Sequence, residues 1–230
     1  MFVPTSDATM GLRVKRMATA LAHRGPDEAG VYVCPSGAGA MASRRLAICD
    51  IPTGQQPLTL CAAGRRITVC FNGEIYNYRA LASELRTAGA VLASGCEAEV
   101  IGQLYAREGA NFLPRLLGPF AIAIFDEPAG NSAPPRCLLA RDRLGQKPLW
   151  LARLPGRLAF ASEAKALIAG GHDVRWNPTA IAPYAVMGYV PAPLSAFDGI
   201  EKLPPGARLM LTDTAAAPQR WYTPPACHAP

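Results

Sequence analysis

The sequence contains no uninterrupted apolar run that approaches the ~20 residues of a membrane-spanning helix. Its first residues also lack a basic segment followed by an apolar core and a small-residue cleavage site, which is the pattern of a secretory signal. We therefore expect neither a membrane partner nor export. The default expectation is a cytoplasmic protein.

Histidine is scarce, with three residues, and none of the seven cysteines forms a Cys-x-x-Cys pair. Structural zinc sites need such closely spaced ligands, so we predict no metal site. An odd number of scattered cysteines is typical of reduced thiols in a reducing compartment, which agrees with a cytoplasmic protein.

Acidic residues are fewer than basic ones, 17 against 23, which gives a formal net charge of +6. The basic residues are mostly dispersed arginines, with Arg44-Arg45 and Arg65-Arg66 as isolated pairs. Nucleic-acid-binding domains carry a basic stripe or a recognised motif, and this chain has neither. We expect no nucleic-acid partner and assign one or two arginines to an anionic small molecule instead.

Half of the residues are hydrophobic and 17% are charged, which is ordinary for a soluble chain that builds a core. Apolar residues at helical spacing predict helices at 12–24, 78–88, 97–108 and 112–117. Short apolar runs between turn residues predict strands at 31–34, 45–49, 67–72, 119–126, 137–141, 149–153 and 158–161. The strand at 119–126 has little polarity and is expected to be covered on both faces. Short antiparallel strands flanked by helix pairs predict an α+β fold with helices over stacked sheets.

The stretch FNGEIYNYR, Phe71 to Arg79, begins where the strand at 67–72 ends in Asn72-Gly73. Asn-Gly alone is a common strand-to-loop turn, because glycine takes up positive φ without strain. The same pair places a side-chain amide beside a freely oriented backbone N–H, and two such neutral donors form a minimal oxyanion hole. The neighbouring motifs decide between these interpretations.

Further motifs follow one another along the chain: HRGPDEAG (23–30), SRRLAICD (43–50), TGQQPL (53–58), EAEVIGQLY (97–105), LARDRLGQKPLW (139–150), FASEAKAL (160–167), GYVPAP (188–193) and FDGIEKLPPG (197–206). With FNGEIYNYR they resemble, in the family's order, the glutaminase domain of glutamine-hydrolysing asparagine synthetases. The resemblance implies the four-layer α/β/β/α sandwich of antiparallel sheets of the N-terminal nucleophile hydrolases. GYVPAP and FDGIEKLPPG resemble the asparagine synthetase linker specifically, which argues against the glucosamine-phosphate and phosphoribosylamine-forming amidotransferases.

The resemblance implies a binding site for L-glutamine. Arg45 matches the position that pairs with the substrate carboxylate, a bidentate task suited to a guanidinium. Asn72 and the Gly73 N–H match the oxyanion hole, and Gly73 and Glu74 match pocket residues. Glu97 stands where the family usually has an aspartate that holds the ammonium group, so its carboxylate is one methylene further out. The alternative role of Glu97 is a favourable charge in the first turn of a helix.

The family's catalytic cysteine has no counterpart at the start of this sequence. In the family the chain begins Met-Cys-Gly-Ile-Ala-Gly, and the exposed cysteine attacks glutamine with its own α-amino group as base. Here the start reads Met1-Phe2-Val3-Pro4. Cys70 shares a strand face with Asn72 but has no free amine, so we interpret it as a small core residue. Because the catalytic cysteine is missing, we expect the chain as written not to hydrolyse glutamine. Two explanations are open: the start of the sequence is misassigned, or the chain is a truncated remnant or split subunit.

Residues 183–230 contain nine of the 22 prolines, a composition typical of extended connection rather than helix or sheet. We therefore predict a glutaminase domain at 1–182 and a proline-rich linker at 183–230 toward a synthetase domain that the chain lacks. No cofactor is expected in this chain. ATP and Mg are expected only for the synthetase domain, in cis or as a separate subunit, which amidates aspartate with the released ammonia. The alternative is a non-catalytic glutamine-binding or interaction module.

Overall fold

The computed structural model describes residues 9–46, 54–128, 133–212 and 216–225. Its helices are α1 (Met10–Ala20), η1 (Ala22–Arg24), α2 (Tyr78–Thr87), α3 (Glu97–Glu108), η2 (Gly109–Arg115), α4 (Ala164–Ala169), η3 (Pro178–Ala180) and α5 (Ile181–Met187), where η denotes a 3-10 helix. Its strands are β1 (Glu28–Val33), β2 (Ala40–Arg45), β3 (Leu58–Ala62), β4 (Arg65–Gly73), β5 (Phe120–Pro128), β6 (Arg136–Arg141), β7 (Trp150–Leu154), β8 (Arg157–Ala161), β9 (Ile200–Lys202), β10 (Ala207–Leu211) and β11 (Gln219–Arg220). Within these ranges, no helix combines the length and the apolar character that crossing a membrane requires.

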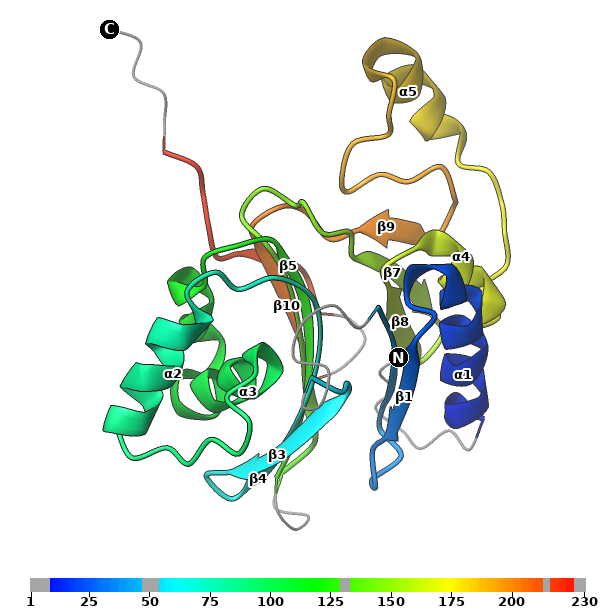
Figure 1. The fold of residues 1–230 in the computed structure, drawn as a ribbon. Coiled ribbons are helices and arrows are strands. Elements are labelled where there is room, and N and C mark those ends of the chain that lie inside the picture. Colours follow the sequence, from blue (N-terminus) through cyan, green and yellow to red (C-terminus); the bar gives the residue numbers. More distant parts are fainter. Residues whose placement is uncertain (1–8, 47–53, 129–132, 213–215, 226–230) are drawn as a thin grey trace, which may run out of the picture.

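The elements stack in four layers (Figure 1). A six-stranded antiparallel sheet, in the order β11-β10-β6-β5-β4-β3, forms one inner layer, and α2 and α3 cover its outer face. The hairpin β1-β2 and the sheet β8-β7-β9 form the second inner layer, with α1 and α4 on its outer side. This arrangement confirms the predicted α+β fold and its α/β/β/α sandwich.

Strand β5 lies at the centre of the larger sheet and is buried on both faces, as predicted. Ile122 and Ile124 pack in the core beneath α2 and α3. Ala121, Ala123 and Phe125 face the core between the two sheets. Because side chains alternate along a strand, the two small alanines point to the same face and leave space between the sheets there.

The second strand differs from its prediction. Strand β2 covers Ala40–Arg45, so of the expected strand 45–49 only Arg45 lies in it, and residues 47–49 lie outside the described part. The turn between β1 and β2 explains the shift, because Cys34 N donates to Gly39 O at 2.8 Å and returns the chain early. That turn sets a register in which Arg45 lies opposite Glu28. The helix expected at 112–117 is the 3-10 helix η2.

The expectation of extended connection after residue 182 is wrong for the strands β9, β10 and β11. Strand β10 pairs antiparallel with β6, and its Ala207, Leu209 and Leu211 are buried. These apolar residues alternate with less buried ones, which is the pattern of a half-buried strand. Pro204-Pro205 lie in the connection between β9 and β10, and β10 itself contains no proline, whereas Pro183 lies in helix α5. That this region leads toward a further domain stays a prediction.

The loop between β6 and β7 is organised around two buried charges. The Asp142 side chain, in a residue that is 1% exposed, accepts hydrogen bonds of 3.0 to 3.2 Å from the N–H groups of Phe120, Leu144, Gln146 and Lys147. The Arg141 guanidinium donates at 2.6 to 2.7 Å to the carbonyls of Gly145, Lys147 and Leu203. Backbone groups therefore provide hydrogen-bond partners for both the Asp142 carboxylate and the Arg141 guanidinium, and these bonds fix the path of the loop.

We predict that Asp142→Ala lowers the free energy of unfolding by about 3 to 5 kcal/mol, since it leaves several buried N–H groups and the Arg141 cation uncompensated. Urea unfolding followed by circular dichroism measures the change. The control is Asp173→Ala at an exposed position, which we expect to stay within about 0.5 kcal/mol of the original chain. An Asp142→Ala variant as stable as this control would contradict the assigned role.

Candidate active site

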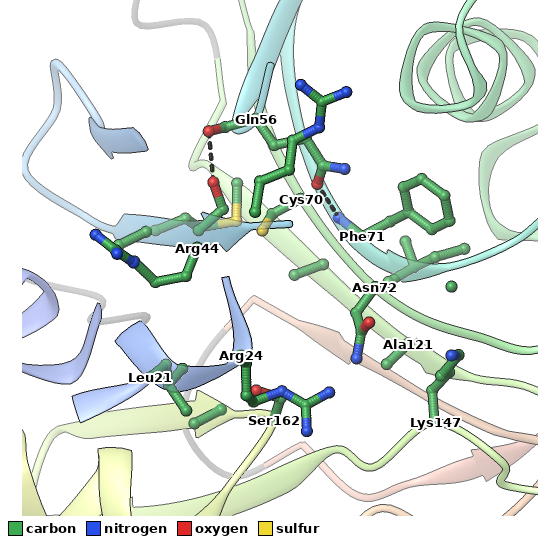
Figure 2. A pocket seen from close by; sticks show the side chains of 18 of the residues that line it. Leu21, Arg24, Arg44, Gln56, Cys70, Phe71, Asn72, Ala121, Lys147 and Ser162 are labelled. Carbon is green, nitrogen blue, oxygen red and sulfur yellow. Dashed lines mark hydrogen bonds between the residues drawn. The ribbon is translucent and has the colours of Figure 1, made fainter. Parts of the chain in front are cut away.

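A cavity of about 470 Å³ lies between the six-stranded sheet and the smaller sheets, with walls from α1, β2, β4, α3, β5 and β8. All the predicted site residues line it, namely Arg45, Asn72, Gly73, Glu74 and Glu97. Figure 2 shows Asn72 and Lys147 on one side of this space, Arg44 across from them, and the Gln56 side chain beside Phe71. Residues that are far apart in the sequence thus meet in one cavity.

The end of β4, which lines the cavity, extends beyond its neighbour β3. Strand β3 pairs with β4 only as far as Val69, whereas β5 pairs with β4 as far as Gly73. Phe120, the residue opposite Gly73, uses both its N–H and its carbonyl with Asp142. Because pairs in an antiparallel ladder alternate in the direction of their hydrogen bonds, the Gly73 N–H points away from β5. The Gly73 N–H points instead to the β3 side of β4, which β3 no longer covers beyond Val69.

Glycine is required at position 73. Its φ is +154°, and a Cβ added there would lie 2.1 Å from Pro119 O. A side chain at this position would therefore push β4 away from β5 at the cavity wall. The glycine of the FNG motif thus has a steric reason, in addition to the turn that the sequence predicts.

The Asn72 side chain carries a donor that has no partner within the described residues. Its Nδ2 atom is buried and makes no hydrogen bond there. A buried unsatisfied amide costs about 1 to 3 kcal/mol, so such a group points to a function. The Asn72 amide and the Gly73 N–H are neighbouring neutral donors at the cavity wall. A pair of this kind can stabilise a negatively charged oxygen.

The cavity wall carries charges of both signs. Its cations are Arg24, Arg44, Arg45 and Lys147, and its carboxylates are Glu74 and Glu97. The Arg45 side chain is 14% exposed, and its Nη1 donates to Glu28 Oε2 at 3.0 Å across the β1-β2 pair. Arg44 turns to the backbone instead, with its Nε donating to Gly25 O at 2.8 Å. A cation facing carboxylates suits a zwitterionic amino acid.

Glu97 is the first residue of α3, and its Oε1 accepts a hydrogen bond of 2.5 Å from Ile75 N. The structure therefore places this carboxylate both in the first turn of a helix and on the cavity wall. The hydrogen bond also ties α3 to the segment that follows Gly73. Glu74 is exposed, and its N–H donates to Pro119 O at 3.0 Å.

The sequence reasoning missed Glu99, which holds the loop before Glu97. Glu99 is 6% exposed and accepts hydrogen bonds of 2.6 to 2.8 Å from Ala93 N, Ser94 N, Ser94 Oγ and Gly95 N. Burial by itself raises the pKa of Glu99, but these hydrogen bonds lower it below its ordinary value. The spacing of Glu97 and Glu99 in EAEVIG is the only signal that could have indicated it.

Gln56, Ser43 and Lys147 also line the cavity and were not predicted as site residues. Each lies inside a motif that the sequence analysis noted, TGQQPL, SRRLAICD or LARDRLGQKPLW. Nothing in those motifs alone shows which side chain faces the cavity. Within the described residues, no group of three or more histidine, cysteine, aspartate or glutamate side chains is placed to hold a metal ion.

Comparison with known proteins identifies the family of this chain. The profile of the glutamine amidotransferase domain family matches residues 3–222. The chain belongs to this family. A Mycobacterium tuberculosis protein named "Putative asparagine synthetase [glutamine-hydrolyzing]" is 36% identical over 223 residues, which cover 92% of this chain and 33% of that protein. Bacillus subtilis asparagine synthetase [glutamine-hydrolyzing] 2 is 41% identical over 162 residues, which cover 70% of this chain and 20% of that protein.

This glutamine amidotransferase domain therefore spans about a third or less of the length of these relatives. Among solved structures, the allosteric regulatory enzyme of purine biosynthesis matches with a TM-score of 0.70 at 18% identity, over 95% of this chain and 48% of that one. A Bacillus subtilis glutamine phosphoribosylpyrophosphate amidotransferase matches with a TM-score of 0.67 at 19% identity. At these identities the structures establish the fold.

The cavity-lining thiols of the described residues are Cys70 and Cys96. Burial raises the pKa of the Cys70 thiol to about 12, so this thiol stays protonated at neutral pH. The reactive form of a cysteine is the thiolate. Cys70 is therefore a core residue that borders the cavity, as the sequence analysis proposed, and is not an activated nucleophile.

We predict that iodoacetamide at pH 8 alkylates the exposed Cys61 well before Cys70, because Cys70 is only partly accessible and stays protonated below a pKa of about 12. Peptide mass spectrometry of timed samples measures both positions. The same reaction in urea serves as the control, where both thiols react. Equal rates in the folded protein would show that Cys70 is activated.

Proposed function

We propose that this domain binds L-glutamine in the cavity between its sheets. Arg45 pairs with the α-carboxylate, and Glu97, with Glu74, holds the α-ammonium group. The Asn72 amide and the Gly73 N–H receive the side-chain carbonyl oxygen. The observation that carries this proposal is the convergence of all these residues on one cavity of about 470 Å³, with an unpartnered Asn72 Nδ2 at its wall.

The chemistry that we propose for this site is hydrolysis of the glutamine side-chain amide. A thiolate attacks the amide carbon, the carbonyl oxygen takes up the negative charge, and Asn72 and Gly73 stabilise that oxygen. Proton transfer to the nitrogen then lets ammonia leave, and water releases glutamate from the thioester. The raised pKa of Cys70 keeps its thiol protonated, so Cys70 does not supply the thiolate for this attack. We assign the attack to an N-terminal cysteine that bears its own amine base, as the family resemblance implies; Phe2 lies outside the described residues.

For the whole protein we propose the reaction of a glutamine-hydrolysing asparagine synthetase. The names and lengths of the relatives support a further, ATP- and Mg-dependent domain or subunit that uses the ammonia to amidate aspartate. In this proposal, the glutaminase part includes β9, β10 and β11, which pair into its sheets, and the chain beyond them leads toward the synthetase part. The cytoplasm is the proposed location, since ATP and free glutamine are available there.

We predict that the chain binds L-glutamine and that Arg45→Lys weakens this binding about tenfold or more, because an ammonium cannot make the bidentate contact. Isothermal titration calorimetry measures the dissociation constant. The control is Arg66→Lys at an exposed position, which should leave the affinity unchanged. Absence of any binding heat with the original chain at millimolar glutamine would overturn the proposed site.

We predict that the chain extended by Cys-Gly-Ile-Ala-Gly before Phe2 releases ammonia from glutamine, and that Asn72→Ala in this variant lowers kcat by about 100- to 1,000-fold. A coupled glutamate dehydrogenase assay measures ammonia, and Asn111→Ala at an exposed position is the control. Full activity of the Asn72→Ala variant would remove Asn72 from the oxyanion hole. Glutamine binding without turnover by the extended chain would favour the non-catalytic binding module.

A further inference from the structure

Gln56 connects the two walls of the cavity (Figure 2). Its side-chain Oε1 accepts a hydrogen bond of 2.6 Å from Phe71 N on β4, and its backbone carbonyl accepts one of 2.5 Å from Ser43 Oγ on β2. The orientation of the Gln56 amide follows from its partner, because an N–H donor requires the oxygen and not the nitrogen. One residue thus links the six-stranded sheet to the β1-β2 hairpin.

Gln56 is also held tightly from the side of β1. A Cβ added to Gly30 would lie 1.9 Å from Gln56 O and 2.9 Å from Pro57 Cδ. The loop therefore packs directly on the bare backbone of β1, and only glycine permits that distance. With three strands in contact, Gln56 has little freedom to shift.

The two strands that Gln56 links both carry site residues at the same spacing. Arg45 follows Ser43 by two positions on β2, and Gly73 follows Phe71 by two positions on β4. Residues two apart on a strand share a direction and are separated by about 6.5 to 7 Å. The Phe71 and Gly73 N–H groups accordingly point to the same edge of β4. Gln56 therefore links β2 and β4 at Ser43 and Phe71. On each strand this link lies two residues from a group proposed to hold one end of glutamine.

We propose that Gln56 is a positioning residue that sets the length of the amino acid accepted by this site. This inference rests on the proposed glutamine site. The distance between the Arg45 guanidinium and the Asn72-Gly73 donors must match the separation of the α-carboxylate and the side-chain carbonyl. Asparagine is one methylene shorter than glutamine and cannot reach both groups when the walls are fixed. Loosening the Gln56 link lets the walls adjust and removes that discrimination.

The test compares glutamine and asparagine binding by titration calorimetry. One methylene is worth about 10- to 200-fold in discrimination, so the original chain should prefer glutamine by at least about tenfold. Gln56→Met keeps the size of the side chain but removes the acceptor for Phe71 N, and Ser43→Ala removes the second hydrogen bond. Each should reduce the preference for glutamine by about tenfold, mainly through weaker glutamine binding, since small errors in placement are costly in such sites.

Two control variants and a stability measurement accompany these substitutions. Ser43→Thr keeps the hydroxyl donor and suits a strand, so it should retain the preference. Gln55→Ala changes an exposed neighbour that does not line the cavity. Thermal melting by circular dichroism shows whether each variant is folded. A role of Gln56 in stability alone would lower the melting temperature and leave the preference unchanged.

The outcomes separate this inference from the function on which it rests. Glutamine binding by the original chain, with a preference that Gln56→Met and Ser43→Ala both reduce, supports the positioning role. Glutamine binding with the same preference in folded Gln56→Met overturns it and leaves the proposed function intact. An original chain that binds neither amino acid overturns the proposed function, and this inference with it.

Discussion

The pairing of β4 with β5 continues to Gly73, whereas its pairing with β3 stops at Val69. The last residues of β4 therefore form a sheet edge inside the molecule that β3 does not cover. The cavity lies beside these residues. The Gly73 N–H points to this edge, which β3 does not cover beyond Val69, whereas the Asn72 side chain projects from the sheet face that it shares with Ala121. The small side chains of Ala121 and Ala123 on β5 leave the space that the cavity fills.

Buried polar groups hold this edge in place through backbone hydrogen bonds. Glu99 holds the loop that precedes Glu97, Asp142 holds both Phe120 on β5 and Lys147 at the cavity, and Gln56 holds Phe71. Each of these acceptors receives N–H groups that would otherwise be unsatisfied in the interior. Because rearrangement would break several such bonds at once, the cavity walls are rigid, and rigid walls suit recognition of a small ligand.

Asn72 contrasts with these satisfied groups. Its Nδ2 is buried without a partner in the described part of the chain, in a structure whose neighbouring polar groups are bonded. Leaving this amide unsatisfied destabilises the fold by about 1 to 3 kcal/mol, which the packing of the rest of the sandwich offsets. In a member of the glutamine amidotransferase domain family, this unpartnered donor beside a positive-φ glycine is the feature on which we base the proposed oxyanion hole.

The sequence by itself determined the family, the helix Glu97–Glu108 and the doubly buried strand β5, since local periodicity and motif order carry that information. It also indicated Arg45, Asn72, Gly73, Glu74 and Glu97, whose roles stay predictions. The tertiary structure decided the register of β2, the membership of β10 in the larger sheet and the convergence of those residues on one cavity. Only the tertiary structure showed that Gln56 and Glu99 accept hydrogen bonds from backbone N–H groups of other segments. Such contacts produce no periodic pattern in the sequence.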